Sequence, residues 1–224
     1  MDAILNMFVG AVLAILTTVT VEWFRRPSLR FQIVPPYDSD YTSRQASPAR
    51  KGRFLAISVQ NSPLPWFLKW LLRNPAMDSW GMVSFHHLDD GQDIFGRAME
   101  GRWSGSTEPP IAAASGVVID SDWLRSHNRR DIQAGESETI DVGARFDDDK
   151  SCYGWSNENY LSNPVWKNPR WELASGRYIV RVEIRTSGQK FVRCFRLCNE
   201  GTIDSFRLEP VQPGHEKRIQ TRNT

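Results

Sequence analysis

Histidine and aspartate side chains near residue 86 are the first groups in this sequence that could do chemistry. His86 and His87 are followed by Asp89 and Asp90, and imidazole with carboxylate is a common set of metal ligands. Neighbouring residues of a strand point to opposite faces, so the two imidazoles cannot bind one ion without a bulge. We therefore expect a strand end and a turn here, with neither a metal site nor a cofactor.

Cysteine and acidic residues offer a second route to chemistry. Cys194 and Cys198 would lie roughly 13 Å apart on one strand face, too far for a shared zinc ion or a disulfide. A hydrolase built on Cys152, or on Asp147 with Asp149, would need a histidine from a distant part of the chain. The sequence also lacks a glycine-rich phosphate loop, H-E-x-x-H and G-x-S-x-G. We therefore expect no enzyme, and a membrane-tethered hydrolase is the alternative.

The long connection from residue 152 to residue 171 is the best candidate for a ligand or partner site. It interleaves aromatic rings with amide and cationic groups, which stack on and hydrogen-bond to bases, sugars or peptides. The other interpretation is a plug that covers one end of the domain with its own side chains. The candidate residues are Trp155, Asn157, Tyr160, Trp166, Arg170 and Trp171.

Short alternating segments must position these groups. Apolar residues recur at every second position from Tyr178 to Ile184, and a tight Ser187-Gly188 turn follows. Seven or eight such strands predict a mainly β domain folded as one antiparallel β-sandwich. We expect Ile140, Val142, Ala144 and Phe146 to share its inner face. The expected strands are 29–34, 53–61, 77–88, 93–103, 137–147, 176–185, 190–198 and 203–208.

The Gly176-x-Tyr178 entry to this hairpin resembles the tyrosine-corner strand of immunoglobulin-like and fibronectin-type-III-like domains. The resemblance extends over roughly thirty residues, and the Cys-Trp-Cys spacing of antibody domains is absent. It implies an immunoglobulin-like architecture and no particular activity.

The N-terminal residues predict a membrane anchor. The run from Ile4 to Val21 contains no charge, and a helix from Ala3 to Phe24 would be roughly 33 Å long against a hydrocarbon core of roughly 30 Å. No cation precedes this run, which disfavours a cleaved signal peptide. We expect an anchor with its basic flank over 1–26, a β-sandwich over 27–212 and a disordered tail over 213–224.

Charge bias predicts the orientation of the anchor. Arg25, Arg26 and Arg30 flank its C-terminal end, so the positive-inside rule places the N-terminus outside and the domain in the cytoplasm, at the inner (plasma) membrane. Three cysteines, an odd number, agree with a reducing compartment. The opposite orientation would make the domain an outward-facing glycan-binding module.

Residues 62–75 predict a short, strongly apolar helix bounded by prolines. It either closes the end of the core or lies among lipid headgroups with its aromatic side chains toward the membrane. The second interpretation gives a set of membrane-contact candidates on the anchor and on this helix: Trp23, Arg25, Arg26, Trp66, Lys69, Trp70 and Arg73.

The anchor also carries small and polar residues at spacings of three and four, which place them on one helix face. Such a face lets two helices approach closely, so we expect self-association of the chain through it. These residues are Asn6, Gly10, Ala14 and Thr17.

All 28 cations follow the anchor, and without Asp2 and Glu22 of the 26 acids that part of the chain has a net charge of +4 (28 − 24), too modest to indicate nucleic acid. The expected partners are the lipid bilayer, an unidentified protein or peptide, and a second copy of the chain. The sequence therefore predicts a single-pass, cytoplasm-facing binding or sensing module that recruits a ligand or partner at the inner leaflet. Its more specific version is a membrane effector that acts through clustered spans.

Overall fold

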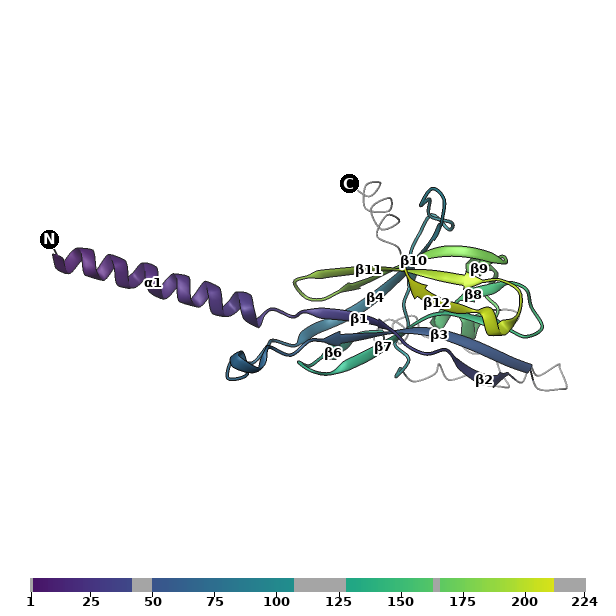
Figure 1. Cartoon of the computed structure of the whole chain (residues 1–224), viewed down its shortest axis with the longest axis horizontal. Coiled ribbons are helices and arrows are strands. Elements are labelled where there is room, and N and C mark those ends of the chain that lie inside the picture. Colours follow the sequence, from purple (N-terminus) through teal and green to yellow (C-terminus); the bar gives the residue numbers. More distant parts are fainter. Residues whose placement is uncertain (1, 42–49, 107–127, 163–165, 212–224) are drawn as a thin grey trace.

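An apolar helix and a β-sandwich follow one another along the chain (Figure 1). The computed structural model describes residues 2–41, 50–106, 128–162 and 166–211; the predicted tail over 213–224 lies outside them. Helix α1 (Asp2–Arg25) projects from one end of the domain. None of the side chains in its most apolar stretch is buried, and the helix is long and apolar enough to cross a membrane.

The first sheet has six antiparallel strands. Their order is β1-β3-β7-β8-β9, and β2 pairs with β3 beside β1 because the long strand β3 offers one half of its edge to each. The strands are β1 (Leu29–Ile33), β2 (Tyr37–Tyr41), β3 (Arg50–Asn61), β7 (Ser137–Phe146), β8 (Cys152–Gly154) and β9 (Glu172–Leu173).

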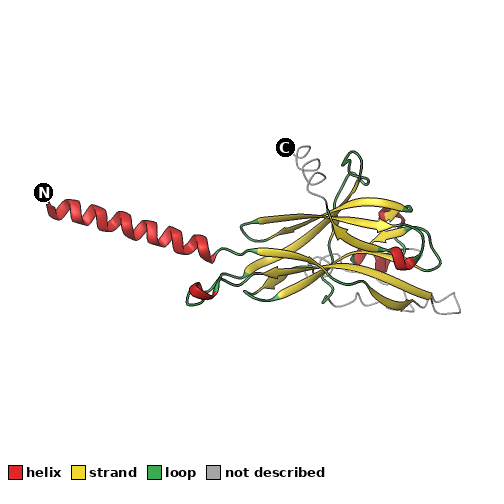
Figure 2. Cartoon of the chain, viewed as in Figure 1, coloured by secondary structure: helices red, strands yellow, loops and turns green. Residues whose placement is uncertain are grey.

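The second sheet also has six antiparallel strands. Their order is β12-β11-β10-β4-β5, and β6 pairs with β4 next to β5. Figure 2 shows the two sheets as separate layers of strands. The strands are β4 (Ala76–His87), β5 (Met99–Glu100), β6 (Arg130–Ile132), β10 (Gly176–Arg185), β11 (Lys190–Asn199) and β12 (Arg207–Pro210).

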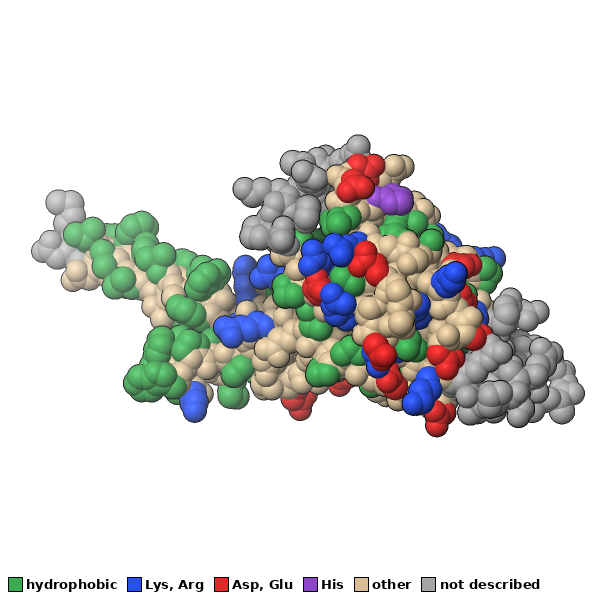
Figure 3. Space-filling model, turned by 45° about the vertical axis from the view of Figure 1, so that its right-hand side comes forward, with side chains coloured by type: hydrophobic (Ala, Val, Ile, Leu, Met, Phe, Trp, Pro, Cys, Tyr) green, Lys and Arg blue, Asp and Glu red, His purple; other side chains and the backbone are tan. Residues whose placement is uncertain are grey.

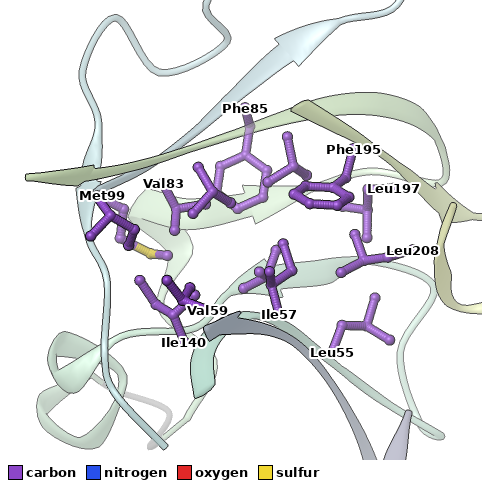
Figure 4. Close-up of a cluster of buried hydrophobic side chains, with 14 of the residues drawn as sticks. Leu55, Ile57, Val59, Val83, Phe85, Met99, Ile140, Phe195, Leu197 and Leu208 are labelled. Carbon is purple, nitrogen blue, oxygen red and sulfur yellow. The ribbon is translucent and has the colours of Figure 1, made fainter. Parts of the chain in front are cut away.

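The main core lies between the two layers (Figure 4). Alternation puts every second residue of a strand on the inner face, and these residues meet across the gap between the sheets. The first sheet contributes Leu55, Ile57, Val59 and Ile140, and the second contributes Val83, Phe85, Phe195 and Leu197. The predicted mainly β, antiparallel sandwich behind an apolar N-terminal helix is thus the observed architecture.

A β-bulge corrects the expected inner face of β7. Leu55 pairs with Gly143 and Ala56 with Asp141, so Val142 is the extra residue in the ladder. One extra residue moves all later side chains to the opposite face. Ile140 and Val142 therefore lie in the main core, whereas Ala144 and Phe146 belong to a second buried cluster on the outer face.

Three further segments differ from expectation. The predicted strand over 93–103 contains the two-residue β5 and isolated bridges at Asp93 and Trp103. The predicted strand over 203–208 is a 3-10 turn, η4 (Ile203–Ser205), followed by β12. The predicted helix near residue 66 is a single 3-10 turn, η1 (Trp66–Leu68), which buries no residue. The prolines that bound this segment leave room for only a short helix, and no residue of the turn is buried. A longer helix does not form because short helices without packing are unstable in water.

The turn before β10 has the geometry of a tyrosine corner. The Tyr178 hydroxyl donates to the Ala174 carbonyl (2.9 Å), and a Cβ at Gly176 would lie 3.3 Å from that hydroxyl oxygen. A kinship with immunoglobulin-like domains stays a prediction, since it rests on this turn and on the architecture.

Candidate functional site

The aromatic connection after β8 is folded against the outer face of the first sheet. Trp155 and Tyr160 are buried there, and Trp155 meets Phe54 edge-to-face at a centroid distance of 4.9 Å. Trp166, which is partly buried, stacks on Phe146 at 6.4 Å. A ligand that stacked on these rings would first have to separate them from the sheet.

The other candidates in this connection also make internal contacts. Helix η2 (Asn157–Leu161) and helix η3 (Pro169–Trp171) carry them. Asn157 Nδ2 donates to Asn128 Oδ1 (2.9 Å), and buried Trp171 donates through Nε1 to a carboxylate oxygen of Glu158 (2.9 Å). Of the six candidates only Arg170 is exposed. This geometry favours the plug interpretation over an open binding surface.

Cys152 has the surroundings of an inert thiol. It lies in the main core, and burial raises the pKa of its thiol despite the nearby Arg145 guanidinium. His86 follows core residue Phe85 on β4, so it faces away from Cys152. Neither His86 nor His87 bonds to Cys152, while His127 and His215 lie outside the described residues.

The acidic turn after β7 is held by internal bonds. The Lys51 amide donates to Asp147 (3.1 Å), and the Tyr153 hydroxyl donates to Asp149 (2.6 Å). Lys167 forms an ion pair with Asp148 (2.9 Å). Within the described ranges, no three histidine, cysteine or acidic side chains come together to hold a metal ion.

His86 pairs with Ser84, a residue that the sequence analysis had not singled out. His86 Nδ1 donates to the Gly91 carbonyl (3.1 Å), so Nε2 accepts from the Ser84 hydroxyl (2.9 Å). Burial lowers the pKa of His86, which keeps the ring neutral. Both side chains line a pocket of about 490 Å³ on the outer face of the second sheet. The i, i+2 spacing, which puts both on one strand face, was the available signal.

Three segments meet where α1 joins the domain, and we call residues 23–28, 62–77 and 186–191 the collar. Arg25 Nε donates to the Leu72 carbonyl (3.2 Å), and the Asn74 amide donates to the Arg25 carbonyl (2.7 Å). Arg73 donates to the carbonyl of Arg26. The β10–β11 hairpin joins through the Ser187 amide, which donates to the Met77 carbonyl (3.1 Å). These bonds hold segments distant in sequence at one end of the domain.

Most of the large apolar side chains in the collar loop over 62–75 face solvent. Trp66, Trp70 and Leu72 are 80%, 75% and 76% exposed, whereas Leu64 is buried and Leu68 and Leu71 are partly buried. The loop therefore does not close the end of the core, which was one of the two interpretations of its sequence. Figure 3 shows apolar side chains along the helix and beside its base, with Lys and Arg side chains near the junction. Exposed aromatic clusters of this kind mark interaction surfaces.

Every membrane-contact candidate lies in the collar. Trp23 is 62% exposed, Arg26 and Lys69 are exposed, and Arg25 and Arg73 are partly buried by the bonds described above. The sequence analysis missed Gln189 and Lys190, which the hairpin brings to the same end. No local sequence pattern predicts that these two residues lie in the collar, because their position depends on the pairing of β10 with β4.

The small-residue face of α1 is open along its length. Asn6, Gly10 and Ala14 are exposed, and nothing lies within 4 Å of where a Cβ on Gly10 would be. The Thr17 hydroxyl donates to the Leu13 carbonyl of its own helix (2.8 Å). Thr17 thus has a partner within α1, and close approach at Gly10 and Ala14 is the main feature that this face offers a second helix.

Comparison with models of protein families, with curated proteins and with solved structures finds no match to this chain.

Proposed function

We propose that this chain is a single-pass membrane protein whose β-sandwich faces the cytoplasm and holds a protein, peptide or lipid partner at the inner leaflet. The collar carries the proposal. Its exposed Trp66 and Trp70 sit at the base of an unburied apolar helix, which is where a bilayer surface would be if α1 spans the membrane. Aromatic rings are enriched at that depth.

The charges of the collar support the orientation. Arg25, Arg26, Lys69 and Arg73 are all at the domain end of α1, and basic residues flank the cytoplasmic ends of membrane helices. The same cations would interact with anionic lipids, each contributing about 1 kcal/mol near the surface. Because α1 leads into β1 after only a few residues, the sandwich would be held close to the bilayer.

Clustering is the mechanism that we propose for signalling. The exposed Gly10 and Ala14 face of α1 would bring spans together. A partner that binds several sandwiches would raise the local concentration of spans and favour their association. In this form the protein is a membrane effector that responds to a partner.

Cysteine labelling in intact cells tests the orientation. The three native cysteines are buried, so a single added thiol gives a clean signal. Gln92→Cys places one on an exposed loop of the domain. We expect a membrane-impermeant maleimide to label it only after the cells are permeabilised. Labelling in intact cells would contradict a cytoplasmic domain and favour an outward-facing glycan-binding module.

A further inference from the structure

A pocket of about 610 Å³ lies in the collar, between the end of α1, the loop after β3 and the β10–β11 hairpin. Arg26, Arg73 and Lys190 line it together with the apolar side chains of Trp23, Leu64 and Phe191. The pocket is therefore amphipathic, with both cations and apolar groups in its lining.

The positive charge of this pocket is not neutralised by its own lining, which contains no acidic residue. Lys190 contacts Glu183 (3.2 Å) outside the pocket. Among the described residues, Arg26 and Arg73 have no carboxylate partner. Arg73 is partly buried, and charged side chains that are partly removed from water are normally paired, so an anion in the pocket would supply the partner that the lining lacks.

Arg73 is the side chain most affected by the lack of an acidic partner in the pocket. Its Nε is buried and has no hydrogen-bond partner, although its Nη1 donates to the Arg26 carbonyl. Burial and then the charge of Arg30 lower the pKa of Arg73. An anion in the pocket would offset both effects through its charge.

The position of the pocket selects the kind of anion. Helix α1 ends at Arg25, so a spanning helix would place Arg26 at the level of the lipid phosphates. The Trp23 and Phe191 rings would then contact the glycerol and upper acyl region. A soluble anion would use the cations but not the apolar wall.

We propose that this collar pocket binds the phosphate of an anionic phospholipid headgroup. The site rests on the proposed function, because it requires α1 to span the membrane. A bound headgroup would fix how the sandwich stands on the bilayer, since its contacts come from the helix, the loop and the hairpin together. Zwitterionic lipids would bind less well because their own cation would face Arg26 and Arg73.

Native mass spectrometry of the full chain in detergent micelles tests the site. Phosphatidylglycerol and phosphatidylcholine are offered at equal concentration, and the retained lipids are counted. We expect the wild-type chain to prefer one phosphatidylglycerol by about tenfold, and Arg26→Gln or Arg73→Gln to lower its retention by about fivefold each. Arg26→Gln separates loss of binding from loss of structure. The Arg73 side chain donates a hydrogen bond that holds the loop, whereas the Arg26 side chain contributes no such bond.

Arg177→Gln is the matched control. It also removes one cation, which forms an exposed ion pair with Glu200 at the other end of β10 from the hairpin, and we expect unchanged retention. Equal retention of the two lipids, or normal retention by both collar variants, would overturn the site. Displacement of the lipid by millimolar inorganic phosphate would overturn the lipid assignment in favour of a soluble anion. If the lipid preference fails while the Gln92→Cys labelling stays cytoplasmic, the pocket assignment alone is wrong.

Discussion

Glu183 brings three cations together around one buried carboxylate. Arg185 and Arg181 contact it at 2.6 and 2.7 Å, and Lys190 at 3.2 Å. Burial raises the pKa of Glu183, but the hydrogen bonds from Arg185 and Lys190 and the charge of Arg181 outweigh it and hold the pKa below its ordinary value. The carboxylate thus fixes Lys190, at the edge of the collar, to the face of the second sheet.

This cluster predicts a pH-dependent contribution to stability. A lowered native pKa stabilises the fold above the ordinary value of 4.5 and loses that effect as the pH falls through the native pKa. At about pH 7 we expect Glu183→Gln to lower the free energy of unfolding by about 2 kcal/mol, because three cations lose their anion. Thermal unfolding of the full chain in micelles should show this difference shrinking below pH 4.5. A difference that stays constant with pH would contradict the assignment.

At the scale of single elements, none of the most apolar stretch of α1 is buried against the domain, and in the proposed function lipid and a second helix would cover it. Gly10 and Ala14 would be the points of closest approach for that second helix, since both are exposed and small. The helix itself would form in a membrane without such a partner, because all its backbone bonds are internal.

A membrane reporter of helix association tests this face. We expect Gly10→Ile with Ala14→Ile to abolish the signal of the α1 span, since bulky side chains keep the backbones apart. Val12→Ile with Val19→Ile is the control, because these residues lie on the opposite side of the helix, and it should leave the signal intact. A signal that survives the first pair of substitutions would remove the clustering mechanism.

Comparison of the expected and observed strands shows which elements could be predicted from the sequence. Alternation located β10 and β11, since both are long and place alternate apolar residues in the main core. It failed after Val142, where a bulge changes the facing of Ala144 and Phe146, because periodicity does not reveal an extra unpaired residue.

Contacts between distant segments explain the other differences. The aromatic connection could not be classified as plug or binding site from its composition. That decision depends on the outer face of the first sheet, where the bulge adds Ala144 and Phe146 to Phe54 of β3. The bond between Arg25 and Leu72 spans 47 positions, so the collar emerges only from the fold. The membrane-contact candidates were chosen from their residue types, because tryptophan beside arginine is typical of membrane interfaces, and their contact with lipid stays a prediction.

The end of the molecule from which α1 projects (Figure 1) differs from the outer face of the first sheet. At that end α1 and the collar expose aromatic and basic side chains. The aromatic connection covers the outer face of the first sheet with buried rings. This asymmetry supports the proposed function, in which the collar would contact lipid and the rest of the sandwich would be available to a partner.

Carbonate extraction of membranes tests the central claim most directly, because it removes peripheral proteins and leaves spanning ones. We predict that the full chain, with its N-terminus intact, stays in the membrane pellet, and that a chain lacking residues 1–26 is found in the soluble fraction. An intact full chain in the soluble fraction would contradict the account.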